Sequence, residues 1–258
     1  MEYGFVAEND GGILQIDGTY ANYSLALKGA VTLSEQSLFL GGSGAGNVYG
    51  TCYVADVSYT APDPLFVMEN TSGIPVVVIS TASVGPNMWQ TRLMALAAVS
   101  VTYYVFSSNV VVAGSGWGMI VYDGVGQPGG TGRPVASSNM KYPLIRQVVA
   151  GNVIGAGPDY GQYNYAAATS FSATFSPGGG RIGVGAIRTP STQFNGSVLS
   201  GAWRGNIGFG GWMTGNGVAT FSTFNWRFGP SSPNPPNFQY DYQSALDYGG
   251  ILIDVSNL

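Results

Sequence analysis

Short runs of β-branched and aromatic residues alternate along this chain with clusters of Gly, Asn, Asp and Pro. Such runs, bounded by turn-forming residues, are typical of β-strands. The pattern predicts strands at 13–17, 48–56, 65–69, 75–80, 99–106, 109–113, 119–122, 181–187, 198–202 and 218–228. Because turn signals recur about every ten residues, the sequence predicts an all-β fold, either a β-sandwich or a jelly-roll-like arrangement.

One segment, 87–98 (NMWQTRLMALAA), is compatible with a short helix. It follows Pro86 and contains Met, Leu, Gln, Arg and Ala, which all favour helices. The residues that come next, VSVTYYVF, strongly favour a strand. The sequence therefore leaves helix and strand open at 87–98, and it predicts at most one short helix in the chain.

The segment 123–134 (DGVGQPGGTGRP) is rich in Gly and Pro and has no apolar face. We expect a loop here, between an N-terminal β region at 1–122 and a C-terminal β region at 135–258, with a single β domain as the alternative. A hairpin is predicted just before it, with strands at 110–113 and 117–122. Residues 124–129 match a GxGxxG pattern, but Pro128 and Pro134 prevent the helix that a dinucleotide site needs, so no nucleotide cofactor is expected.

Histidine is absent from the 258 residues, and Cys52 is the only cysteine. This removes the commonest general base, every Ser-His-Asp or Cys-His arrangement, and a zinc site within one chain. Charged residues make up 9% of the chain, against roughly 25% in an average globular protein. The composition favours a structural or binding role, and we expect no enzyme activity, no metal and no cofactor. A glycan-cleaving enzyme remains an alternative, because it needs only two carboxylates, and Asp241 and Asp247 lie in a Tyr-rich segment.

The charge pattern also limits the partners. The net charge is −4, and the nine Lys and Arg residues are scattered singly. Without a basic stripe, nucleic acid is not an expected partner. The apolar runs are shorter than the roughly 20 residues of a membrane helix, so no membrane insertion is expected. The acidic N-terminal segment, with Glu2, Glu8 and Asp10, predicts no signal peptide.

The aromatic residues carry the positive signal. Several lie beside Gly, Asn, Gln or Arg, a setting in which rings stack on sugar faces and polar groups bind hydroxyls. Protein interfaces favour the same residue types, and core packing is the third explanation for each ring. The candidate contacts with a partner protein or a glycan are Tyr160, Tyr163, Tyr165, Trp203, Arg204 and Trp212.

The N-terminal residues MEYGF, followed by NDGGILQID and the Tyr/Asn run GTYANYSL, resemble small virion proteins from the tail modules of tailed bacteriophages. Those proteins often open with a short YGF segment, an Asn/Gly turn and a strand that ends in Asp. The matching positions are Tyr3, Gly4, Phe5, Asn9, Gly12 and Asp17. The rest of the chain is similar to them in style, being rich in Gly, Ser, Thr and Asn.

The resemblance implies a non-enzymatic structural protein of the tail tip, baseplate or tail fibre, assembled in the host cytoplasm and located in the virion. Residues near the N-terminus would dock on the particle, and the later aromatic loops would contact a partner protein, a host receptor or a surface glycan. Other virion tail proteins are the expected partners, together with further copies of the chain, most simply in a trimer. The low charge agrees, because it protects a free monomer poorly. A free carbohydrate-binding module or lectin is the main alternative.

Overall fold

The structure is a computed structural model that describes residues 6–8, 14–17, 23–43, 46–108, 120–122, 134–137, 140–152, 171–189, 191–198, 204–228, 238–245 and 247–258. The described residues form strands and turns with no helix, and the fold is all-β, as the sequence predicts. Since the described part contains no helix, it contains none that could span a membrane.

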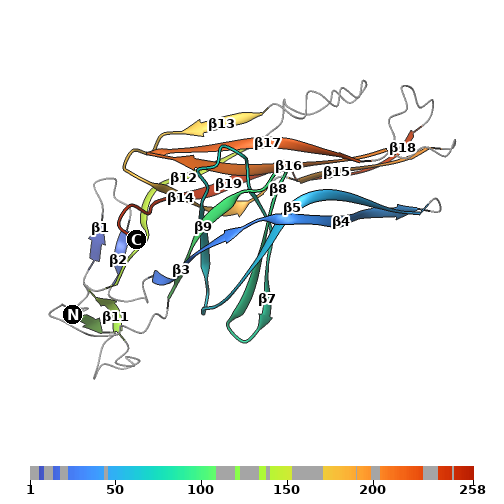
Figure 1. The fold of residues 1–258 in the computed structure, drawn as a ribbon. Helices are drawn as coiled ribbons and strands as arrows, with labels where there is room; N and C mark the ends of the chain where they lie inside the picture. The colour runs from blue at the N-terminus through green and yellow to red at the C-terminus, as the bar shows by residue number, and fades with distance from the viewer. Residues whose placement is uncertain are drawn as a thin grey trace.

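A six-stranded antiparallel sheet forms one layer of a β-sandwich (Figure 1). It draws on both halves of the chain, because three neighbouring strands from after residues 123–134 are followed in its order by three from before them. That order is β12 (Leu144–Asn152), β19 (Asp247–Asp254), β14 (Ile182–Arg188), β6 (Leu65–Glu69), β9 (Ser100–Ser107) and β3 (Ser24–Thr32). The two sets meet where β14 pairs with β6, with Val184 opposite Met68.

Two further antiparallel sheets form the other layer. The four-stranded sheet has the order β4 (Ser34–Ser43), β5 (Gly46–Thr60), β8 (Met88–Ala95) and β7 (Val77–Gly85). The five-stranded sheet has the order β13 (Ser172–Phe175), β17 (Val218–Phe228), β16 (Arg204–Gly215), β15 (Ser191–Val198) and β18 (Phe238–Ala245). The far ends of β4 and β5 and of β15 to β18 run beyond the rest of the sandwich to the same side of the molecule (Figure 1).

Two small hairpins complete the described strands. β1 (Val6–Glu8) pairs with β2 (Leu14–Asp17), and β10 (Ile120–Tyr122) pairs with β11 (Pro134–Ser137). Pro134, which the sequence assigns to a loop, thus begins a strand. The hairpin expected over 110–122 lies outside the described residues except for β10.

The main core lies where the three larger sheets meet. The six-stranded sheet contributes Val184 and Leu252, the four-stranded sheet Val57 and Leu93, and the five-stranded sheet Phe221, all buried. A second cluster, of Val67, Tyr104, Phe106, Ile253 and Val255, covers the opposite face of the six-stranded sheet. We call the face toward the main core the inner face and the other the outer face. Successive residues of a strand alternate between such faces.

The four-stranded and five-stranded sheets join at one point. Val76, just before β7, exchanges two backbone hydrogen bonds with Trp212 of β16, with N···O distances of 3.1 and 2.8 Å. The buried Asn70 side chain donates to the carbonyls of Trp212 and Ile74, at 2.9 and 2.7 Å. These bonds satisfy backbone groups that would otherwise be buried without partners.

The segment 87–98 contains a strand, so the helix that the sequence left open there does not form. β8 follows a tight turn in which Asn87 has a φ of 55°, a value that Asn tolerates better than most residues. Trp89, Thr91 and Leu93 then point to the side of the main core, and β8 pairs with β5 and β7 along its length. Burial of alternate residues between two strands outweighs the helix propensity of Met, Leu and Ala.

Both edge strands of the six-stranded sheet have a glycine that pairs with a tyrosine on the neighbouring strand. Gly29 on the edge strand β3 lies opposite Tyr103 of β9, and Gly151 on the edge strand β12 lies opposite Tyr248 of β19. In each case a Cβ on the glycine would overlap the tyrosine ring, so the ring covers the edge strand's backbone. Such aromatic–glycine pairs fix strand register at an edge.

Candidate functional site

Trp212, one of the predicted contact residues, belongs to the core. Its side chain is 1% exposed, and its ring meets those of Phe221 and Tyr248 at centroid distances of 5.2 and 6.3 Å. Its register opposite Phe221 places both residues on the side of β16 and β17 that faces the main core. The prediction of a ligand contact at Trp212 is therefore wrong, because no sugar ring or partner can reach the indole of the folded chain.

Of the other predicted contact residues, the structure describes only Arg204. Arg204 is the first residue of β16, where it lies opposite Gly196 of β15. Tyr160, Tyr163, Tyr165 and Trp203 lie outside the described residues. These positions stay predictions.

The docking segment is described only in part. Asp17 is the last residue of β2 and lies opposite Val6 of β1, so a strand does end in Asp at this position. Tyr3, Gly4, Phe5, Asn9 and Gly12 lie outside the described residues.

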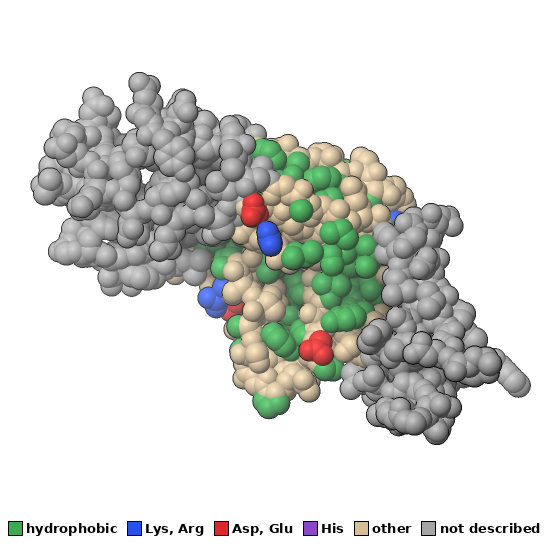
Figure 2. All heavy atoms as spheres, turned by 180° about the vertical axis from the view of Figure 1, so that it is seen from behind, with side chains coloured by type: hydrophobic (Ala, Val, Ile, Leu, Met, Phe, Trp, Pro, Cys, Tyr) green, Lys and Arg blue, Asp and Glu red, His purple; other side chains and the backbone are tan. Residues whose placement is uncertain are grey.

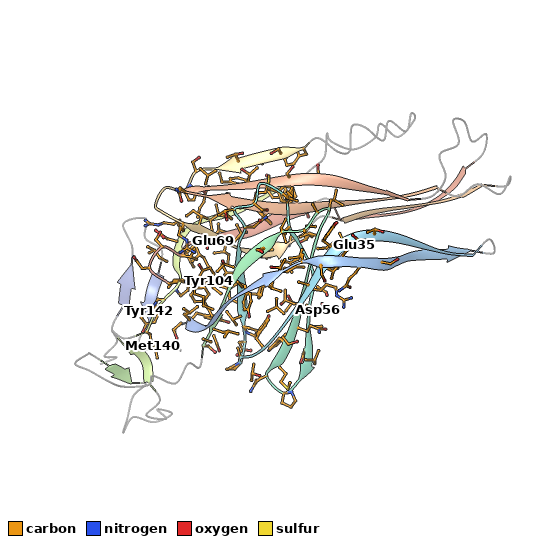
Figure 3. The ribbon with its side chains drawn as sticks, viewed as in Figure 1. Glu35, Asp56, Glu69, Tyr104, Met140 and Tyr142 are labelled. Carbon is orange, nitrogen blue, oxygen red and sulfur yellow. The ribbon has the colours of Figure 1, made fainter. Side chains whose placement is uncertain are left out.

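The clearest polar cluster lies on the outer face of the six-stranded sheet and is centred on a buried carboxylate. Glu69, at the end of β6, is 6% exposed and accepts hydrogen bonds from both sides. Arg181 Nε donates to its Oε1 at 2.7 Å, Arg181 Nη2 donates to its Oε2, and the Tyr104 hydroxyl donates to Oε2 at 3.0 Å. Figure 3 shows Glu69 and Tyr104 close together. A paired Arg fork is the arrangement that best compensates a buried carboxylate.

The electrostatics of this cluster favour a fixed ion pair. Burial, with the hydrogen bond to Glu69 second, raises the pKa of Tyr104 to about 12. The hydrogen bond to Glu69 raises the pKa of Arg181 above its already high range. Lys28 lies over the Tyr104 ring at 5.4 Å and donates to the Leu258 carbonyl at 2.7 Å. Tyr104 therefore stays protonated and Arg181 stays charged across the physiological pH range.

The cluster braces distant parts of the chain. Glu69 and Arg181 are 112 residues apart in sequence, and Arg181 directly precedes β14. The Arg181 backbone also bonds Ser256 and Val255, beyond β19. Sequence reasoning missed this pair, because the only local signal is an acidic residue at the end of the apolar run LFVME. The geometry fits a structural role in holding β6, β14 and the chain after β19 together.

A second feature is the hairpin of β7 and β8, which leaves the sandwich at one side (Figure 1). Six of the nine residues of β7 are exposed, and they include Ile79 and Val84 at 38% and 55%. Met88, after the turn, is 48% exposed. Figure 2 shows the described surface from behind, with few charged side chains among hydrophobic and uncharged polar ones. Ile79, Val84 and Met88 are the exposed large hydrophobic residues of this hairpin.

No protein-family model, curated protein or solved structure matches the chain. Within the described ranges, no group of three or more Cys, Asp or Glu residues is placed to hold a metal ion.

Proposed function

We propose that this chain is a non-enzymatic structural protein of a bacteriophage virion, part of the tail tip, baseplate or tail fibre, and that it contributes to attachment to the host. It acts by assembling with further copies of itself and with other tail proteins. The N-terminal segment that resembles tail-module proteins supports the particle-docking part of this proposal.

The observation that carries the proposal is the pair of strand sets that extends past the core. β5 has 15 residues, so at about 3.4 Å per residue it spans about 50 Å, and its far end runs with that of β4 beyond the rest of the sandwich (Figure 1). β16 and β17 likewise continue past Trp212 and Phe221 to strand ends beside β15 and β18. Strand ends that run past the rest of a sandwich are suited to cover by neighbouring subunits.

The charge distribution supports assembly over catalysis. The buried carboxylate of Glu69 is committed to Arg181 and Tyr104, and Asp56 is paired with Arg92 at 2.7 Å. Asp254 is paired with Arg146, also at 2.7 Å. These carboxylates serve to hold strands together, which is the work required of a building block.

The test is to locate the chain in particles. Tailed phage particles from a lysate that expresses the chain are purified on a density gradient and labelled with gold-conjugated antibody raised against the purified protein. We expect label at the tail tip, baseplate or fibres in electron micrographs, and peptides of the chain in the particle band. Abundant protein in the lysate with none in the particle band would contradict the proposal. A glycan array with the isolated protein identifies the lectin alternative, which predicts saturable binding without particles.

A further inference from the structure

β7 is an edge strand with one side open. It pairs with β8 along one side, and the sheet order gives it no second neighbour among the described strands. Residues 79 to 84 are all exposed. Register irregularities fall between Val78 and Ser80 and between Ser83 and Gly85, so the regular stretch is the short segment 80–83, with Ile79 and Val84 at its ends.

The open edge is held in place at its start and at its middle. At its start, the Val76–Trp212 bonds tie the chain to the buried core. Further along, the Thr81 and Thr91 hydroxyls bond at 3.0 Å, and Thr91 also bonds the Tyr59 hydroxyl at 2.9 Å. The edge is therefore ordered before any partner arrives, so pairing costs little conformational entropy.

Charge distinguishes β7 from the other long edge strands. The terminal strands of the three larger sheets carry Lys28 in β3, Arg146 in β12, Glu35 in β4 and Asp241 in β18. Apart from β7, β13 is the one terminal strand of these sheets without a charged residue, and it has only four residues. β7 has nine residues (VVISTASVG) with no charge and no proline. Natural proteins guard sheet edges with charges, prolines and β-bulges, and β7 has only the register irregularities at the two ends of 80–83. The regular stretch between them is a template for another strand.

The absence of charge also selects the occupant. When two copies of one strand pair antiparallel about a two-fold axis, a charged residue of one copy lies near the same residue of the other copy. The repulsion between these like charges destabilises the pairing. β7 meets no such penalty. Reversal of direction brings the Ile79 end of one strand beside the Val84 end of the other, so exposed apolar residues lie together at both ends of the contact.

We propose that β7 is the site at which a second copy of this chain adds, β7 to β7 and antiparallel, to form one continuous eight-stranded sheet from two four-stranded ones. The proposal rests on the proposed function, because it names the surface through which copies first assemble. A two-fold dimer then takes the place of the trimer as the basic unit. Main-chain hydrogen bonds provide the affinity, as in other cases of strand addition.

The experiment compares two lysine substitutions on one row of the sheet. Ala82 of β7 lies beside Gln90 of β8, which lies beside Ser58 of the central strand β5, and both Ala82 and Ser58 are exposed. Ala82→Lys places a charge on the open edge, and Ser58→Lys places the same charge two strands away. By light scattering after size exclusion, we expect twice 26.8 kDa for the unsubstituted chain and for Ser58→Lys, and 26.8 kDa for Ala82→Lys.

A charge reversal guards against a folding artefact. Ala82→Glu alone should also be monomeric, and an equimolar mixture of Ala82→Lys and Ala82→Glu should regain the double mass, because opposite charges meet across the contact. An oligomer whose mass is the same in all variants would overturn the β7 contact and leave the proposed function standing. A monomeric unsubstituted chain would overturn the contact too, while gold labelling of particles decides the proposed function separately.

Discussion

The six-stranded and four-stranded sheets solve the edge problem in different ways. The six-stranded sheet has clusters on both faces, a charged residue on each edge strand, and a tyrosine ring over a glycine at each edge. The four-stranded sheet contributes Val57 and Leu93 to the main core, and its β7 edge is uncharged, with residues 79–84 exposed. The contrast separates stability from association: the first sheet holds the fold, and the second is free to bind.

Substitutions in the two sheets should therefore have separable effects. Changes around the six-stranded sheet should lower the free energy of unfolding and leave the solution mass of the folded protein unchanged. Changes on the exposed part of β7 should alter the mass with little effect on unfolding. Three experiments test the first half of this comparison, taken in order of expected effect.

Trp212→Ala should have the largest effect. The indole packs between Phe221 and Tyr248 and against Gly250 of the six-stranded sheet. Trp212 is 1% exposed. Loss of a buried Trp costs about 3–5 kcal/mol through lost contacts and the remaining cavity. Urea unfolding measures it, with Met213→Ala, at the half-buried next position, as the control that should cost less. A loss below about 1 kcal/mol would contradict the core placement.

Arg181→Met should come second. It leaves the Glu69 carboxylate buried with only Tyr104 as a partner, but Arg181 itself is 44% exposed, so solvent moderates the loss. We expect about 2–3 kcal/mol by urea unfolding. The double variant Glu69→Gln with Arg181→Met removes the uncompensated charge and should recover part of the loss. A double variant less stable than Arg181→Met would show that the ion pair is not what Arg181 contributes.

The two edge glycines give the smallest and most discriminating comparison. Gly151→Ala should cost about 1–2 kcal/mol, because its Cβ meets Tyr248, which is held by stacking on Phe221 at 4.4 Å. Gly29→Ala should cost less than about 1 kcal/mol, because Tyr103 is half-buried and stacks more loosely on Phe66, at 5.9 Å. Thermal unfolding of both variants checks the order, and equal losses would refute the argument.

The strands were the predictable part of the fold. The segments 65–69 and 218–228 form strands with the predicted bounds, because apolar and β-branched residues dominate both. β8 was ambiguous because Met, Leu and Ala favour helices, and only its two partner strands decide the outcome. The burial of aromatic residues was harder to predict. Phe221 and Trp212 are both buried, and the glycine-rich sequence around Trp212 did not indicate that its side chain belongs to the core.

Long-range pairings lay beyond sequence reasoning. The Glu69–Arg181 pair joins residues 112 positions apart, and a single isolated charge in each segment gives no indication of its partner. The six-stranded sheet likewise mixes strands from both halves of the chain, which composition around 123–134 could not indicate. The open edge of β7 follows from its place at the end of a sheet, a property of topology and not of its nine residues.

Hydrogen exchange of backbone amides at low and high protein concentration tests the contrast between the two sheets most directly. The account predicts that protection over residues 80–83 rises with concentration, while protection along β3 and β12 stays the same. Protection that rises along β3 or β12, or that stays constant over 80–83 in a protein whose solution mass does increase, would contradict it.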